Sequence, residues 1–209
     1  MPDRSALTLS RTRGDILATG AYQQDFRRRD HEITGRSGWK FERRQRFKEQ
    51  NSPSWDAFQR GEWQEALQLL KAKGDMWERI AREDRERGSV FHRVRVVEEP
   101  LTPYLHWELH ALRVQGAGGM PVRVVGAEKV RSLEIAEQLP EVVSLGGQVL
   151  YEVLYTESGV LDGAVRFQEP GLIGNWEAFI RGLYEEGEDI VSYVDRRVAH
   201  LPAPVVKTE

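Results

Sequence analysis

Polar and apolar residues alternate most regularly in the segment 91–97, and this alternation predicts a strand. Arg93 and Arg95 alternate with valines, which gives the two-residue period of a strand with one apolar face. Pro100 follows closely and removes the backbone donor that a longer strand would need. The sequence therefore predicts a strand that stops abruptly, and strand ends of this kind are common places for functional sites.

A helix and a second strand are predicted after this point. Thr102 can cap the helix, Pro103 suits its first position, and leucines recur at helical spacing as far as Leu112. A glycine-rich break at 116–119 precedes the apolar segment 122–125. Together these features predict a β-α-β unit.

The patterns on either side predict further helices and a hairpin. In residues 54–87 the apolar positions recur at helical spacing in three runs that glycines separate. The apolar segments 149–155 and 160–167 flank the turn 156–159, which is the pattern of a β-hairpin. Residues 171–199 are amphipathic at helical spacing.

These elements predict an α+β fold class with a helical N-terminal part, a mixed sheet of about four strands and C-terminal helices. The sheet contains the β-α-β unit and the hairpin. We expect residues 52–201 to form a single α+β domain, preceded by a basic N-terminal arm at 1–51 and followed by a tail at 202–209. The arm is inferred from its runs of arginine and its few aliphatic residues.

Charge is divided unevenly along the chain, although the net charge is only −3. Residues 1–50 hold 12 Lys and Arg against 7 Asp and Glu, whereas residues 51–209 hold 18 against 26. A basic arm on an acidic body can bind nucleic acid, fold back on its own body or contact an acidic partner, and we favour the second. The arm residues suited to contacting phosphates or stacking on bases are Arg27, Arg28, Arg29, Trp39, Lys40, Arg43 and Arg44.

The absence of cysteine excludes disulfides, thiolate metal sites, iron–sulfur clusters and cysteine nucleophiles. The N-terminus has no continuous apolar run of the signal-peptide type, and no window approaches the roughly 18 apolar residues of a membrane span. We therefore expect a cytoplasmic protein that does not bind a membrane.

Motifs for metal, phosphate and nucleophilic chemistry are weak. His106 and His110 stand four residues apart with Glu108 between them, but this is not the zincin order and no third ligand is evident. The chain has no Gly-x-Ser-x-Gly elbow and no P-loop. We expect no metal and no cofactor.

Carboxylates and arginines near the predicted strand end are the best candidates for a site. If the two strands of the β-α-β unit are neighbours, their arginines and the helix carboxylate can converge at the sheet end, where α/β folds commonly place ligands. A structural set of ion pairs that ties strand to helix is the alternative, and it is the more usual fate of arginines on strands.

A resemblance rests on Arg93-Val-Arg-Val-Val-Glu-Glu-Pro-Leu-Thr-Pro-Tyr104, on Trp107-Glu-Leu109 and on the segment 122–125. In these motifs the chain resembles an actinobacterial family of uncharacterised proteins, a domain of unknown function often encoded beside helix-turn-helix regulators. The similarity extends over about residues 54–201 and leaves out the arm. The positions that match the family pattern, and that we predict to bind a ligand or partner, are Arg93, Arg95, Glu99, Tyr104, Glu108 and Arg123.

The resemblance implies a regulatory accessory role by association, and it carries over no catalytic residue. We therefore expect a binding module that acts with a protein partner, such as a helix-turn-helix regulator, or with a small ligand. A hydrolase or nuclease that uses carboxylates and arginines at the sheet end is one alternative. Nucleic-acid binding through the arm is another.

Overall fold

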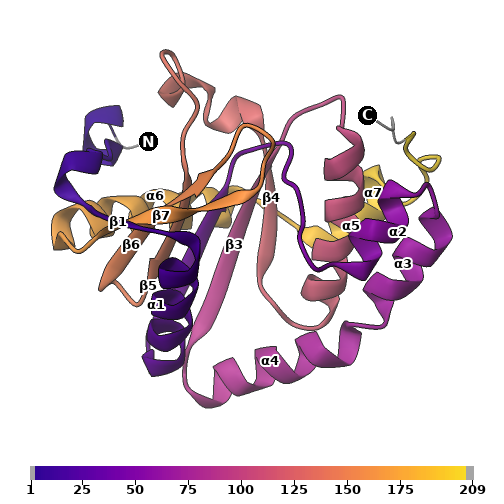
Figure 1. Ribbon diagram of the computed structural model, residues 1–209, viewed down its shortest axis with the longest axis horizontal. Coiled ribbons are helices and arrows are strands. Elements are labelled where there is room, and N and C mark those ends of the chain that lie inside the picture. Colours follow the sequence, from indigo (N-terminus) through magenta and orange to yellow (C-terminus); the bar gives the residue numbers. More distant parts are fainter. Residues whose placement is uncertain (1–2, 206–209) are drawn as a thin grey trace.

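The computed structural model, which describes residues 3–205, is built around one mixed sheet (Figure 1). Within these residues the sheet has eight strands in the order β1-β7-β6-β5-β2-β3-β4-β8. The neighbours β2, β3 and β4 are parallel, and all other pairs are antiparallel. The strands are β1 (Asp15–Leu17), β2 (Ser37–Glu42), β3 (Val90–Val97), β4 (Val122–Gly126), β5 (Glu141–Leu145), β6 (Val149–Tyr155), β7 (Leu161–Phe167) and β8 (Glu188–Asp189).

Helices cover both faces of the sheet (Figure 1). Helix α6 packs behind the strands β2 to β5, whereas α1 and α5 lie on the front face, and α7 packs against α5 and β4. The small helices α2, α3 and α4 flank α5. The helices are α1 (Thr19–Glu32), α2 (Pro53–Gln59), α3 (Trp63–Lys71), α4 (Gly74–Glu86), α5 (Pro103–Ala117), α6 (Pro170–Glu186) and α7 (Ile190–Arg197).

The predicted α+β class is confirmed, and so are the β-α-β unit, the hairpin and the C-terminal helices. Strands β3 and β4 are parallel neighbours joined by α5. The hydroxyl of Thr102 accepts a hydrogen bond from the Leu105 N–H at 3.0 Å, and Pro103 occupies the first turn, as the capping pattern predicted. Strands β6 and β7 form the antiparallel hairpin.

The sheet has eight strands rather than the predicted four or so: the basic N-terminal segment supplies β1 and β2, and β5 and β8 were also not predicted. Residues 1–51, expected as an arm, supply β1, α1 and β2, and β2 is paired on both sides, with β3 and β5. Trp39 and Phe41 pack into the apolar core behind the sheet, while Lys40 and Glu42 face the front. The segment therefore adds a central strand to the sheet and does not lie beside it as an arm.

The two ends of the described chain differ in structure. The first described residues form a short 3₁₀ turn, Arg4–Leu7, which packs on α6. At the other end, residues 202–205 form neither helix nor strand, and the rest of the predicted tail lies outside the described residues.

Candidate functional site

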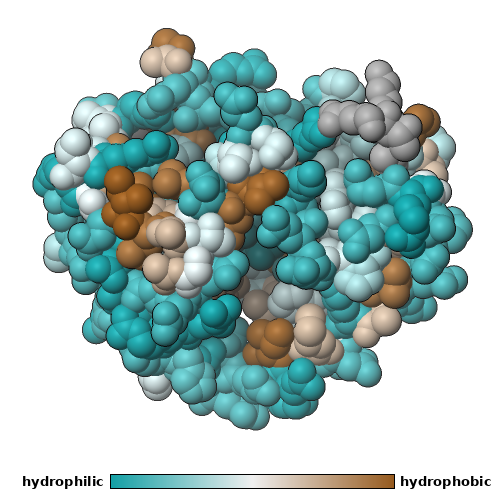
Figure 2. All heavy atoms as spheres, in the orientation of Figure 1, coloured by the Kyte–Doolittle hydropathy of each residue, from teal (hydrophilic) through white to brown (hydrophobic). Residues whose placement is uncertain are grey.

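A cavity of about 530 Å³ opens on the front face of the sheet, between α1 and α5. Figure 2 shows the surface hollowed near the middle of this face. Strands β2 and β3 form its floor, α5 and the loop 43–52 form one wall, and Trp77 of α4 also lines it. We call it the central cavity, and its chemically distinctive residues are Lys40, Glu42, Lys48, Glu49, Asn51, Lys73, Arg93, Tyr104, Trp107, Glu108 and Tyr155.

Strand pairing places four charged residues side by side beneath this cavity. In the parallel register of β2 and β3, Lys40 lies opposite Arg93 and Glu42 lies opposite Arg95. Because successive side chains of a strand point to opposite faces, all four leave the sheet on the side away from Trp39. The floor of the cavity is therefore charged, whereas the other face of the same two strands is apolar.

Arg95 is the most buried of these four residues, with no exposed surface. Its Nε donates to Glu108 Oε2 at 2.8 Å, and its Nη2 lies 2.7 Å from the same oxygen. Its Nη1 donates to the carbonyls of Glu42 and Val96, and the guanidinium lies over the ring of Phe47 at 5.8 Å. Arg95 therefore ties β3, the end of β2 and α5 together, which is a structural role.

Glu42 is 3% exposed and lies between two cations. Lys40 Nζ is 2.5 Å from its Oε1, and Arg93 Nη1 is 3.6 Å from its Oε2. Burial alone would raise the pKa of Glu42, but Arg93, Lys40 and Arg95 together lower it to about 2. Glu42 is therefore ionised at neutral pH, and its Oε2 has no hydrogen-bond partner within residues 3–205.

Two further buried glutamates surround Arg95. Burial and the charge of Glu42 raise the pKa of Glu108, and Arg95 opposes this rise. Glu141 lies behind the cavity and accepts the N–H groups of Arg43 and Arg44 at 2.7 and 2.6 Å. Burial raises the pKa of Glu141 to about 7. Two buried carboxyl groups therefore hold protons more tightly than usual beside a third that is ionised.

Aromatic rings form part of the wall of the cavity. The Tyr104 hydroxyl donates to Glu49 Oε1 at 2.7 Å, and burial raises the pKa of Tyr104. The Tyr104 ring contacts Phe47 and Trp107 at centroid distances of 5.6 and 5.8 Å. Nearby, Asn51 has a φ of 56°, in the left-handed region that asparagine adopts more readily than most residues other than glycine.

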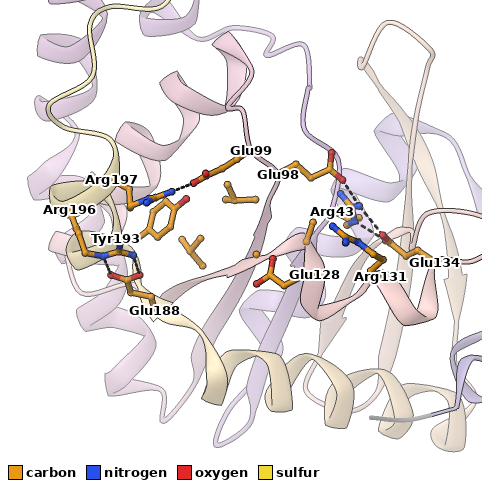
Figure 3. A pocket seen from close by; sticks show the side chains of 14 residues that line it. Arg43, Glu98, Glu99, Glu128, Arg131, Glu134, Glu188, Tyr193, Arg196 and Arg197 are labelled. Atoms are coloured by element: carbon orange, nitrogen blue, oxygen red, sulfur yellow. Dashed lines mark hydrogen bonds and ion pairs between the residues drawn. The ribbon is translucent and has the colours of Figure 1, made fainter.

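The structure brings together four of the six residues that the sequence predicted to bind a ligand or partner. Arg93, Tyr104 and Glu108 line the central cavity, and Arg95 lies directly behind it. Glu99 lies elsewhere, at a second cavity described below, where it pairs with Arg197 of α7 (Figure 3).

Arg123, the sixth of these residues, lies on the opposite face of the sheet. The register of β3 and β4 places it opposite Val94, so it shares the face that α6 covers. There its guanidinium lies 5.4 Å from the ring centroid of Tyr184, and its Nη1 donates to the Gly187 carbonyl. The prediction that Arg123 joins the other arginines is therefore wrong.

Several residues predicted to contact nucleic acid are already engaged inside the protein. Trp39 is buried and stacks on His92 at a centroid distance of 4.2 Å, and the guanidinium of Arg181 lies over the Trp39 ring, 5.2 Å from its centroid. Arg43 is buried and pairs with Glu98 and Glu134. Neither side chain is free to contact a base or a phosphate.

The other five predicted nucleic-acid contacts are nearer the surface. Lys40 pairs with Glu42, Arg44 lies over the ring of Tyr155, and the remaining three are on α1. Arg28 and Arg29 both pair with Asp25, whereas Arg27 is exposed to solvent. These residues therefore do not form one continuous basic surface.

The histidine pair on α5 packs against an aromatic ring. His106 and His110 stack at a centroid distance of 5.6 Å, and Trp63 contacts both rings. Burial lowers the pKa of both, that of His110 to about 4. Within the described part of the chain, no group of three or more His, Cys, Asp or Glu side chains is arranged to hold a metal ion.

A second cavity of about 750 Å³ lies at the carboxyl ends of β2, β3 and β4 (Figure 3). We call it the edge cavity. On one side Arg43 holds Glu98 and Glu134, and on the other Arg196 holds Glu188, as the dashed lines of Figure 3 show. Four arginines and five glutamates line it, and most of these charges pair with one another.

Together, the fold and the central cavity define an α+β protein with a charged cavity on one face of a mixed sheet. The chain matches the family model described as "Domain of unknown function (DUF6879)" over residues 24–195, and it belongs to that family. The match begins within α1, so the family domain includes β2. No curated protein and no solved structure matches the chain. No helix in residues 3–205 is long and apolar enough to cross a membrane.

Sequence reasoning missed Glu42, Glu49 and Glu141 at this site, and also the lysines Lys48 and Lys73. A signal for Glu42 exists in the alternation of Trp39, Lys40, Phe41 and Glu42, which is the pattern of a strand with one apolar face. No local signal marks Glu141, because its burial depends on contacts with residues about 98 positions away.

Proposed function

We propose that the protein is a binding module for a small polar ligand, which occupies the central cavity. The observation that carries the proposal is Glu42, an ionised and buried carboxylate that lines the cavity between Lys40 and Arg93. Its Oε2 is buried without a hydrogen bond in the described part of the protein, 3.6 Å from Arg93 Nη1, and a ligand that moves the Arg93 side chain can supply the missing donor. A volume of about 530 Å³ falls within the usual range for small-molecule sites.

The cost of these charges also supports a functional role. Replacing buried ion pairs by well-packed apolar residues is often neutral or stabilising, so stability alone does not require them. The back face of the same strands carries Trp39, Phe41, Val94 and Val96, so β2 and β3 can be built with apolar side chains. Charged residues on the front face are therefore better explained by binding than by stability.

We further propose that the module acts with a protein partner. The support is the resemblance to proteins encoded beside helix-turn-helix regulators, which makes such a regulator the first partner to test. Ligand binding in the central cavity would then change the affinity for that partner, and the coupling would be reciprocal.

A hydrolase is the second candidate function, and one specific observation favours it. Neighbouring charges lower the pKa of Glu42 while burial raises that of Glu108, and both line the same cavity. Two carboxyl groups whose pKa values are shifted in opposite directions are typical of the acid and base pairs of enzymes. This candidate predicts a turnover that Glu108→Gln abolishes while the fold is kept.

Calorimetric titration with a fixed set of probes tests the binding proposal. Adenosine, adenosine 5′-monophosphate, glucose, glucose 6-phosphate, glutamine and glutamate cover the relevant polar groups. We expect at least one probe to bind the wild type and to bind Glu42→Gln at least about tenfold more weakly, because a hydrogen bond to a charged group is lost. Glu185→Gln, an exposed change on α6, is the matched control. Equal affinities for wild type and Glu42→Gln, or no binding of any probe, would overturn the proposal.

A further inference from the structure

The central cavity has a surplus of positive charge. Four cations line it, namely Lys40, Lys48, Lys73 and Arg93, against three carboxylates, Glu42, Glu49 and Glu108. Arg95 adds a fifth cation directly behind the wall. Glu141 adds a fourth carboxyl group there, but burial raises its pKa to about 7, so a large fraction of it is uncharged at neutral pH.

Each carboxylate of the cavity already has a partner. Glu108 is held by Arg95, and Glu49 accepts the hydroxyl of Tyr104. Glu42 is shared by Lys40 and Arg93. None of these three carboxylates is therefore left to neutralise a further cation.

Two lysines that line the cavity from different segments, the loop 43–52 and the start of α4, keep unused charge. Across residues 3–205, neither Lys48 nor Lys73 forms an ion pair. The backbone of Lys48 is fixed, because its N–H donates to the Gly159 carbonyl at 2.9 Å. Lys73 lies in the short turn between α3 and α4, and its backbone is fixed as well, because its N–H donates to the Leu70 carbonyl at 3.0 Å.

From this arrangement we infer that the ligand carries an anionic group, a phosphate or a carboxylate, on a polar body that has hydrogen-bond donors. The inference rests on the proposed function and names its ligand class. The anionic group binds the cations at the mouth, Lys48 and Lys73, and the donors of the polar body reach Glu42 on the floor. The aromatic wall around Tyr104 and Trp107 packs against the body of the ligand.

Matched pairs of probes test this inference by calorimetry. Glucose 6-phosphate is compared with glucose, adenosine 5′-monophosphate with adenosine, and glutamate with glutamine. We expect the more anionic member of at least one pair to bind at least about tenfold more tightly than its parent, and its affinity to fall as salt is raised from 50 to about 300 mM. Equal affinities within every pair would overturn the inference.

Charge-removing variants separate this inference from the proposed function. Lys48→Gln and Lys73→Gln should each lower the affinity for the anionic probe about tenfold and leave the affinity for the parent probe unchanged. Lys71→Gln, an exposed lysine on α3 outside the cavity, should change neither affinity. If neither Lys48→Gln nor Lys73→Gln changes the affinity for the anionic probe while Glu42→Gln still weakens binding, the inference of an anionic ligand group is refuted and the proposed binding function stands. If no probe binds, both proposals fail.

Discussion

Glu141 should make the stability of the protein fall as the pH rises from about 4.5 to about 7. Its Oε1 accepts the N–H groups of Arg43 and Arg44, and its Oε2 has no hydrogen-bond partner among residues 3–205. Burial raises the pKa of this carboxyl group to about 7, against an ordinary value of 4.5. The folded state therefore binds the proton more tightly than the unfolded chain does.

The sign of the effect follows from this difference. The stabilising contribution is complete below pH 4.5, where both states are protonated, and it is lost as the pH rises through about 7. Each pKa unit corresponds to 1.36 kcal/mol, so the loss amounts to about 3 kcal/mol. Glu42 and His110 have lowered pKa values, to about 2 and about 4, and their contributions are lost as the pH falls instead. A comparison between variants is therefore needed to isolate Glu141.

Glu141→Gln provides that comparison, because the amide keeps an oxygen for both N–H groups and cannot titrate. The free energy of unfolding is measured by urea denaturation from pH 4.5 to 8 for wild type, Glu141→Gln and the exposed control Glu185→Gln. From pH 4.5 to pH 8 we expect the free energy of unfolding of the wild type to fall by about 3 kcal/mol relative to that of Glu141→Gln. Glu185→Gln should show the same pH dependence as the wild type. If the difference in free energy of unfolding between wild type and Glu141→Gln did not change with pH, or if the wild type gained stability relative to this variant as the pH rose, Glu141 would not be a buried carboxyl group that holds its proton.

Three further predictions concern the fold, and urea denaturation at pH 7 measures each. Arg95→Met should lower the free energy of unfolding by about 3–5 kcal/mol, because it leaves Glu108 buried and unpaired. Adding Glu108→Leu should restore most of the lost stability, and a double variant as unstable as the single one would contradict this. Trp39→Ala should cost about 3–5 kcal/mol, whereas Arg27→Ala on the surface of α1 should stay within about 0.5 kcal/mol. Similar costs for both would mean that β2 is not a central strand. Gly163→Ala should cost more than about 1 kcal/mol, because φ is +114° and a Cβ would lie 2.2 Å from the Leu17 carbonyl oxygen; an unchanged midpoint would argue against that approach.

The sequence predicted those parts of the fold whose signals are local. The β3-α5-β4 unit was predicted because its strands are rich in valine and its helix begins with Thr102 and Pro103. Strand β2 was missed because its outward Lys40 and Glu42, with the arginines around it, gave the composition of a basic arm. Its pairing partner β5 lies about a hundred residues away, so no local pattern reveals the pairing.

The candidate site was predicted in part, for the same reason. Arg93 and Arg95 share a face because they are two residues apart on one strand, and this can be derived from sequence alone. The face of Arg123 depends on the register between β3 and β4, which places it opposite Val94, and sequence does not give that register. The burial of Glu141 likewise depends on tertiary contacts.

The most direct test of the central claim is native mass spectrometry of the full chain purified from the cells that produce it naturally. Wild type, Glu42→Gln and Glu185→Gln are compared under identical gentle conditions. Binding in the central cavity predicts that wild type and Glu185→Gln retain the same small molecule, seen as one added mass that disappears on denaturation, and that Glu42→Gln loses it. Three proteins without added mass, or a Glu42→Gln protein that retains the same molecule, would contradict a ligand site built around Glu42.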